Sequence, residues 1–415
     1  MLSAMLLRGL RAKGTLELLV AGCSGIGCVA ALISILVGQL TPWWALLLVP
    51  LGIFNAIEVI GYLAYRPVVV KPYVLVSSDS AGSADGDGEP REGQRRGAVR
   101  WQLDTGGAVK ESSPVVVNGT VYVGSWNHLL WAVDALSGEE RWQCRVGGVV
   151  AASPAVANGT VYIGSWDKSL WAVDAVSGRE RWRVRTDGLV RSTPVVTDGM
   201  VLFGSNDGFF RAVDAVSGKS RWQVRVGTGV RSSPTVVGDS VYVGSDNGVL
   251  WALHTASGQV RWQLKTLSGL WSSPVVAGGI LYVGSADRHL WAVDVASGQV
   301  RWKLPAGTWV KSTPAVADGL VYFGTGDGYL WAVDAVSGER RWSRKVGVWV
   351  RWAPVVADGT LYVGTNDGRM WALDAVSGEE QWQAHTGSPV FSTPAVANGM
   401  LYFGLQNGRL LGVRA

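Results

Sequence analysis

The sequence predicts an all-β fold over residues 98–415, an eight-bladed β-propeller of 40-residue, four-stranded repeats, preceded by a two-helix transmembrane hairpin. The first observation is a proline with a period of 40: Pro114, Pro154, Pro194, Pro234, Pro274, Pro314, Pro354 and Pro394. The second is a tryptophan that keeps this step after one longer interval: Trp101, Trp142, Trp182, Trp222, Trp262, Trp302, Trp342 and Trp382. The third is a two-residue turn rich in Gly, Asn and Asp, four residues after each proline. Short antiparallel strands repeated in this way are typical of propeller blades.

The first predicted region, residues 1–71, is a membrane hairpin. No charged residue lies between Leu18 and Ile57, and a membrane-spanning helix needs about 20 apolar residues. We therefore expect helices over residues 18–38 and 43–65, making the chain an integral membrane protein of the plasma (inner) membrane with two spanning helices. Small residues in the first helix would let the second approach closely.

The side of the membrane follows from the basic residues. Arg8, Arg11 and Lys13 precede the hairpin and Arg66 and Lys71 follow it, while the turn between the helices has none. The positive-inside rule then places both ends, and the propeller, in the cytoplasm. The alternative is extracytoplasmic, because Val20–Cys23 matches a lipoprotein cleavage box; against it, the apolar stretch before Cys23 is short and contains Glu17.

Two further features of this region bear on function. Glu58 falls inside the second predicted helix, where an ionisable group is either functional or lies near the interface and remains protonated. Residues 72–97 form the next predicted region, a flexible linker, because their Ser, Gly, Asp and Arg content offers nothing to bury.

Each 40-residue unit contains four strands of about five residues, here named A to D in chain order. In the second unit, Pro154 heads strand A, Asn158-Gly159 forms the A–B turn, Leu170–Asp174 is strand C, and Trp182 lies on strand D. Asn-Gly and related pairs suit two-residue hairpin turns that need positive φ. Strands A and B should therefore form a tight hairpin in every unit.

The ends of the repeat region predict how the ring closes. The eighth A–B–C set occupies residues 394–414 and has no strand D after it, whereas Val99–Asp104 carries a strand-D tryptophan with no set before it. Pairing this first strand with the last blade would complete eight blades and remove two free sheet edges.

Composition excludes some classes of function. The chain has a net charge of +5 spread over 415 residues, which argues against a protein that grips nucleic acid. Its three cysteines, Cys23, Cys28 and Cys144, form neither a disulfide framework nor a metal knuckle.

The segment Ala132–Trp142 and its counterparts resemble the tryptophan-docking motif of the quinoprotein, or PQQ-like, propeller family. In that motif, Asp134 would accept turn amides, Gly138 would take positive φ, and Trp142 would lie between neighbouring blades. Two units depart from the pattern, with Arg211 in place of a strand-C tryptophan and His254 in place of the aspartate.

Residues that are not repeated point to a binding site. Three residues before each repeat proline, the units carry mostly basic or aromatic side chains, and six tryptophans outside the repeated positions fall in D–A or B–C connections, which share one face of a propeller. The predicted binding residues are Trp126, Trp166, Arg191, Arg231, Trp271, Trp309, Lys311, Trp349, Arg351, Trp352 and Phe391. Aromatic rings beside cations suit a protein or peptide partner or a small anionic ligand. The alternative is that these tryptophans only pad loops and the arginines are solvated.

The same residues weigh against catalysis. The resemblance implies that family members which oxidise alcohols bind pyrroloquinoline quinone with calcium, channel carboxylates and an adjacent cysteine pair. This chain has no such pair, and the predicted ring offers one carboxylate, Glu111. We therefore expect no catalytic residue, no metal and no cofactor, and a binding or scaffold module without enzymatic activity. A second resemblance, to the lipoprotein propeller of outer-membrane protein assembly, leaves an envelope assembly role as the alternative.

Overall fold

The computed structural model describes residues 15–23, 28–36 and 96–415, and the chain divides into two compact units, residues 1–66 and 67–415. In the first unit, β1 (Thr15–Cys23) and β2 (Cys28–Leu36) form an antiparallel pair in which Thr15 lies opposite Leu36 and Cys23 opposite Cys28.

The described part of the helix predicted over residues 18–38 is extended in this pair, so the structure does not show that helix, and the transmembrane hairpin stays a prediction. An apolar run without polar interruptions has no periodicity that separates a helix from a strand, so the sequence pattern is compatible with both. No helix in the described ranges is long and apolar enough to span a bilayer. The second predicted helix at 43–65, Glu58, and all of the predicted linker except Arg96 and Gly97 lie outside the described residues.

The second unit contains the strands of the repeats. The innermost strands, A, are β4 (Val115–Val117), β8 (Ala155–Ala157), β12 (Val195–Thr197), β16 (Thr235–Val237), β20 (Val275–Ala277), β24 (Ala315–Ala317), β28 (Val355–Ala357) and β32 (Ala395–Ala397). The B strands are β5 (Thr120–Gly124), β9 (Thr160–Ser165), β13 (Met200–Gly204), β17 (Ser240–Gly244), β21 (Ile280–Gly284), β25 (Leu320–Gly324), β29 (Thr360–Gly364) and β33 (Met400–Gly404). The C strands are β6 (Leu129–Asp134), β10 (Ser169–Asp174), β14 (Phe209–Asp214), β18 (Val249–His254), β22 (His289–Asp294), β26 (Tyr329–Asp334), β30 (Arg369–Asp374) and β34 (Arg409–Arg414). The outermost strands, D, are β7 (Glu140–Arg145), β11 (Glu180–Arg185), β15 (Ser220–Arg225), β19 (Val260–Lys265), β23 (Val300–Pro305), β27 (Arg340–Lys345), β31 (Glu380–His385) and β3 (Val99–Asp104).

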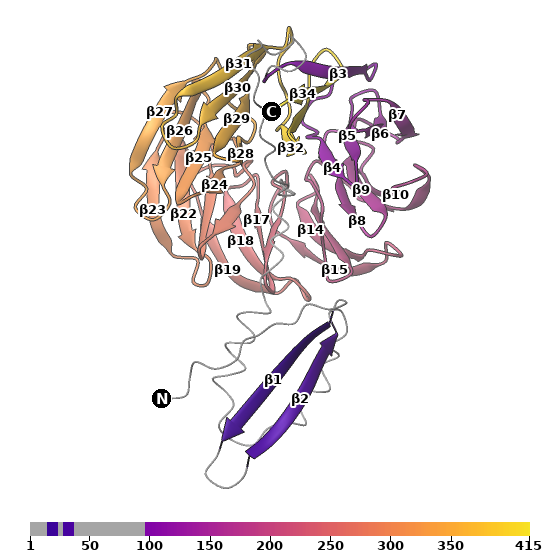
Figure 1. The fold of residues 1–415 in the computed structure, drawn as a ribbon, viewed down its shortest axis with the longest axis vertical. Helices are drawn as coiled ribbons and strands as arrows, with labels where there is room; N and C mark the ends of the chain where they lie inside the picture. Colours follow the sequence, from indigo (N-terminus) through magenta and orange to yellow (C-terminus); the bar gives the residue numbers. More distant parts are fainter. Residues whose placement is uncertain (1–14, 24–27, 37–95) are drawn as a thin grey trace. The chain divides into compact units, whose positions relative to one another are not determined.

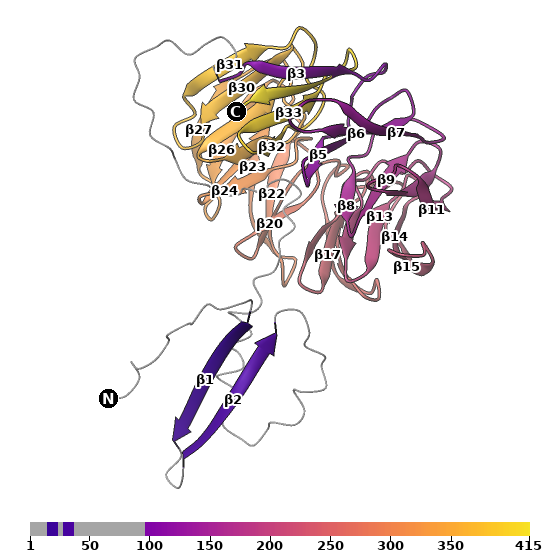
Figure 2. The same ribbon diagram turned by 45° about the vertical axis from the view of Figure 1, so that its right-hand side comes forward.

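These strands form eight four-stranded antiparallel sheets arranged as a ring in chain order (Figures 1 and 2). The inner strands of successive blades lie side by side, and β32 contacts β4 to close the circle. The eighth sheet has the order β3-β34-β33-β32, with Trp101 opposite Gly412 and Asp104 opposite Arg409. The predicted closure by the first strand is therefore confirmed.

The A–B turns follow the predicted chemistry. Seven of the eight place both central residues at positive φ, as in Asn158 (49°) and Gly159 (68°). In the turn Gly238-Asp239, only the glycine does so. Strand A is shorter than predicted, at three residues in each blade, and each begins directly after the repeat proline, which has no amide hydrogen for the ladder.

Tryptophans of strand D join neighbouring blades. A Cβ on Gly178, whose φ is +70°, would lie 2.8 Å from the Trp142 ring, so only glycine lets the indole pack flat on the turn of the next blade. The Trp142 indole also donates to the Ala175 carbonyl at 3.0 Å. The same bond recurs from Trp101 to Ala135, and the packing of an indole on a glycine recurs in every blade. The docking role predicted for these residues is confirmed.

The eighth dock is made from the two ends of the repeat region. Trp382 packs on Gly97, and the Gly97 amide donates to the Arg414 carbonyl at 2.8 Å. This bond is the counterpart of the one from the Gly138 amide to the Asp134 carbonyl in the first blade. Among the described residues, the buried Trp382 indole nitrogen finds no hydrogen-bond acceptor, whereas the indole nitrogens of the other seven strand-D tryptophans each donate to a carbonyl.

The face that carries the A–B and C–D turns, here called the turn face, repeats one polar arrangement. Asp134 accepts the amides of Leu136 and Ser137 at 2.9 Å and pairs with Arg141 at 2.6 Å. Arg141 and the Ser137 amide lower the pKa of Asp134 to about 2. Equivalent Asp–Arg pairs occur in four further blades, at Asp174–Arg181, Asp214–Arg221, Asp294–Arg301 and Asp334–Arg341.

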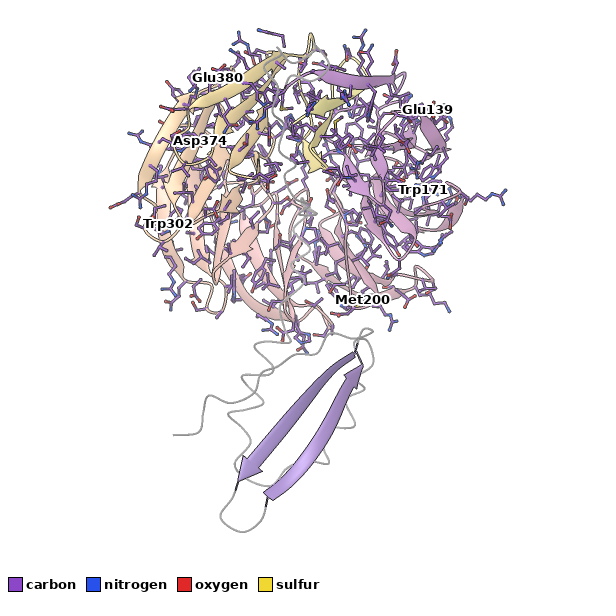
Figure 3. The ribbon with its side chains drawn as sticks, viewed as in Figure 1. Glu139, Trp171, Met200, Trp302, Asp374 and Glu380 are labelled. Carbon is purple, nitrogen blue, oxygen red and sulfur yellow. The ribbon has the colours of Figure 1, made fainter. Side chains whose placement is uncertain are left out.

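The core lies between the blades. Each cluster of buried side chains combines residues of two neighbouring sheets, as where Tyr122 and Leu130 pack with Ile163 and Trp171. Side chains fill the blades in Figure 3, while the exposed Glu139, just before β7, and Glu380, the first residue of β31, lie at the periphery. This rigid ring fixes the positions of the loops on the opposite face, here called the rim face, which carries the D–A and B–C connections.

Candidate functional site

A cavity of about 230 Å³ opens at the centre of the rim face and receives side chains from all eight blades. Its walls come from two positions in each repeat, three residues and one residue before the proline. The first position contributes Glu111, Ala151, Arg191, Arg231, Trp271, Lys311 and Arg351. The second contributes Ser113, Ser153, Thr193, Ser233, Ser273, Thr313, Ala353 and Thr393, and Trp352 lies beside them.

The second position forms a belt of hydroxyls that links the blades. The Ser113 amide donates to the Ser153 hydroxyl at 2.9 Å, and the Thr393 amide donates to the Ser113 hydroxyl at 3.0 Å. Four more bonds of this kind join Thr193 to Ser233, Ser233 to Ser273, Ser273 to Thr313, and Ala353 to Thr393. These hydroxyls were not among the predicted site residues, although a Ser or Thr before seven of eight repeat prolines is a periodic signal in the sequence.

Glu111 is the acidic side chain of the cavity and is held by two arginines from other blades. Arg191 lies 3.0 Å from one carboxylate oxygen, and Arg351 lies 3.6 Å from the other. The Glu111 backbone has φ of +71°, and its amide donates to the Phe391 carbonyl at 2.9 Å. The carboxylate is 16% exposed, so the ion pairs are partly shielded from water.

The cations on the other side of the cavity are arranged differently. Arg231 pairs with Asp246 at 3.1 Å, a residue of the neighbouring B–C loop. The Lys311 ammonium lies over two indoles, 4.1 Å from the Trp271 ring and 4.6 Å from the Trp309 ring. Burial and repulsion by Arg351 and Arg231 lower the pKa of Lys311 below its ordinary value. Positive charge is therefore crowded in this part of the cavity.

The structure brings all of the predicted binding residues together around this cavity. Arg191, Arg231, Trp271, Lys311, Arg351 and Trp352 line it. The other five touch these residues or their neighbours: Trp166 stacks under Arg191, Trp126 on Trp166, Trp309 under Lys311, Trp349 against Trp309, and Phe391 against Trp352. These eleven residues are here called the rim.

One contributor was missed by the sequence analysis. The Lys110 ammonium lies 4.7 Å from the Trp126 ring and 5.0 Å from the Phe391 ring, and so it joins two rim aromatics from neighbouring blades. Lys110 lies outside the position, three residues before each proline, on which the prediction was based. A single lysine in the sequence does not by itself indicate a binding residue.

The residues present do not fit a calcium–quinone centre. Calcium prefers six to eight oxygen ligands, including several carboxylates. Within the described ranges, no group of three or more His, Cys, Asp or Glu side chains is placed to hold a metal ion. The cavity carboxylate of Glu111 is already neutralised by two guanidinium groups. A quinone cofactor with a bound metal would meet cations where it needs oxygen ligands.

A comparison with protein families shows which family the chain belongs to. The model of the family described as outer membrane protein assembly factor BamB matches residues 92–304 and 306–415. The chain belongs to this family. Its PQQ-like resemblance is thereby confirmed, while no curated protein sequence gives a significant match.

Solved structures of this architecture include BamB, an alcohol dehydrogenase and a designed protein. BamB from Moraxella catarrhalis is 19% identical, with a TM-score of 0.66, over 76% of this chain and 99% of that one. The quinohemoprotein alcohol dehydrogenase from Comamonas testosteroni is 17% identical, with a TM-score of 0.65, over 76% of each chain. The computationally designed Ika8 protein is 16% identical, with a TM-score of 0.68, over 75% of this chain and 98% of that one. At these identities the likeness concerns the fold, and the function must be argued from the site.

Proposed function

We propose that this chain is a non-catalytic binding module of the BamB family that holds a segment of a protein partner on the rim. The observation that carries the proposal is the convergence of the non-repeated residues. The blades are nearly interchangeable, yet the tryptophans and cations that differ between them make one connected surface around one cavity. Packing of the blades does not require this, so we attribute it to a partner.

The kinds of side chain support a protein partner. Tryptophan and arginine are the residues most enriched at energetically dominant positions of protein interfaces. Trp349 is 47% exposed and Trp271 is 38% exposed, whereas the docking residue Trp142 is 9% exposed. Large exposed indoles that are rimmed by charge are typical of interaction sites. The guanidinium-bound state of Glu111 also leaves the cavity without a free carboxylate for acid–base work.

The description of the family supports one class of partner. A family described as outer membrane protein assembly factors favours a partner from the machinery that assembles membrane proteins. This is the alternative that the sequence left open, and it places the propeller outside the inner membrane, whereas the positive-inside rule places it in the cytoplasm. A recognition or scaffold module in the cytoplasm is the second candidate, favoured by the basic residues that flank the apolar segment.

Capture of a partner from native membranes by crosslinking tests the proposed function. The variant R191A/R231A/R351A should lose the crosslinked partner. The matched control is R181A/R221A/R341A, which removes three arginines that also pair with carboxylates, but on the turn face. Both variants should melt as the wild type does. Equal capture by the two variants would refute a binding role of the rim.

We further propose that the N-terminal region attaches the propeller to a membrane, because Leu18–Ile57 offers forty residues without a charge. The full chain should stay in the pellet after alkaline carbonate extraction, and a variant that begins at Gly93 should be released. A cytosol-dependent reporter fused after Ala415 then separates the two candidate locations, since it is active in only one. Release of the full chain by carbonate would contradict the attachment.

A further inference from the structure

Charge is distributed unevenly inside the central cavity. Four of its lining residues are cations, Arg191, Arg231, Lys311 and Arg351, and one is an acid, Glu111. Glu111 engages two of the cations and Asp246 engages a third. Within residues 96–415, no carboxylate lies within 4.0 Å of the Lys311 ammonium, which rests against Trp271 and Trp309. Four cations thus face two carboxylates, which leaves two positive charges of the cavity unbalanced.

The way in which Glu111 is bound indicates which anion fits beside Lys311. The carboxylate of Glu111 enters the cavity and is held by guanidinium groups from two blades, at 3.0 Å and 3.6 Å. On the opposite side, Asp246 pairs with Arg231, but within residues 96–415 no carboxylate reaches the Lys311 ammonium. An ammonium without a counter-ion in a half-buried site is costly, and a carboxylate from outside would lower that cost.

We propose that the cavity is a receptor for one carboxylate side chain of an acidic peptide segment, with Lys311 as its anchor and Glu111 as a built-in competitor for Arg351. This inference rests on the proposed function and names the chemistry that the partner segment must carry. Arg231 and Arg351 border the anchor and add positive potential. The exposed indoles of Trp271 and Trp349 flank it, where the peptide on either side of the acid would pack.

The size of the cavity agrees with this occupant. A volume of about 230 Å³ accommodates several water molecules at about 30 Å³ each, and therefore a single acidic side chain. It falls below the roughly 300–1,000 Å³ of typical small-molecule sites. The hydroxyls of the belt accept hydrogen bonds from neighbouring amides, which leaves their O–H groups to donate to an anion. The cations supply the charge that favours a carboxylate.

Binding of two matched peptides to the unaltered full chain is the first test. The probes are acetyl-Ala-Phe-Glu-Phe-Ala-amide and its counterpart with Gln in place of Glu, measured by calorimetry at low salt. The Glu peptide should bind at least about tenfold more tightly than the Gln peptide, because the difference is one charge opposite a cation. Equal affinities would overturn the inference without any variant being made.

Two variants and a control assign the residues. Lys311→Met should weaken the Glu peptide about tenfold and leave the Gln peptide unchanged. Glu111→Gln should strengthen the Glu peptide by about threefold or more, a gain that a merely structural role of Glu111 would not produce. The matched control is Lys303→Met, which removes a lysine stacked on Trp291 on an outer strand and should change neither affinity.

The remaining outcomes separate the sources of the anion. Inorganic phosphate that binds as tightly as the Glu peptide, with the same dependence on Lys311, would replace the peptide with a small-anion site. Loss of partner capture in R191A/R231A/R351A together with equal affinities for the Glu and Gln peptides would refute this inference alone. Capture that survives the triple substitution would refute the proposed function, whatever the peptides do.

Discussion

Charged side chains find their partners within one blade on the turn face and in other blades on the rim face. On the turn face, each carboxylate of the repeated pairs meets an arginine of its own blade, as Asp134 meets Arg141. On the rim face, Glu111 reaches arginines that are two blades away in either direction, and Lys311 lies over indoles. The turn face therefore repeats one local ion pair in five blades, whereas the charged groups of the rim face make contacts across the ring.

This difference separates residues that build the ring from residues that use it. A group repeated in every blade is explained by the packing of one blade on the next, and its loss should lower stability. A group that occurs once and contacts other blades only through the cavity is not needed for that packing. Substitutions of the same kind on the two sides should therefore have different effects.

The largest contrast is expected between two tryptophans. Trp142→Ala removes a docked indole together with its hydrogen bond to Ala175 and should lower the free energy of unfolding by about 3–5 kcal/mol. Trp349→Ala removes a rim indole that is 47% exposed and should change that free energy by about 0.5 kcal/mol or less. Urea unfolding followed by circular dichroism measures both. Similar losses would mean that the rim also holds the ring together.

A smaller effect is expected from alanine substitutions at two turn-face glycines, one that packs against a docked indole and one that does not. Gly178 and Gly199 both have φ of +70°, but an added Cβ meets the Trp142 ring at 2.8 Å only at Gly178. Gly199→Ala should cost about 1–2 kcal/mol from its backbone alone, and Gly178→Ala about 1–3 kcal/mol more from the overlap. Thermal melts of the two variants give the comparison. Equal melting temperatures would show that the indole yields easily.

The smallest expected effect is the loss of stability when low pH protonates Asp134. The pKa of Asp134 is lowered to about 2 by Arg141 and the turn amides, below the value of about 4 expected in the unfolded chain. Its contribution to stability is complete above pH 4 and is lost as the pH falls towards 2. Because the pair is exposed, Asp134→Asn should cost less than about 1 kcal/mol at pH 7 and nothing at pH 2. Melts across this range test it, and a pH-independent difference would contradict the ion pair.

The sequence predicted most of the propeller because the repeat shows the same unit eight times. Periodic prolines, turns and tryptophans determined the number of blades and the closing strand. The role of residues that depart from the repeat could be seen only in the structure. Arg211 replaces a strand-C tryptophan and donates to both oxygens of Asp207, at 3.0 and 2.7 Å. In the preceding blade, the equivalent Trp171 donates to Asp167. Burial raises the pKa of Asp207, but hydrogen bonds from Arg211, the Phe209 amide and Ser205 together outweigh it and bring the pKa to about 2.

The candidate site was predictable in membership but not in geometry. Spacing from the prolines gathered Arg191, Lys311 and Arg351 on one ring, since equivalent residues of a symmetric fold occupy equivalent places. Which of them Glu111 contacts depends on distances across the ring, and no spacing encodes those. The helix predicted over residues 18–38 stays a prediction for a related reason: an uninterrupted apolar run is compatible with either type of backbone.

The pairing of β3 with β34 has a consequence for biosynthesis. Thr105, at the end of β3, bonds to Gly408, which is 303 residues later in the chain. At a translation rate of about 5–20 residues per second, that partner is made about 15–60 s after β3 has left the ribosome. The first strand of the ring to be synthesised is therefore the last to find its neighbour, and until then a nascent chain carries an open sheet edge that its own final residues must cover.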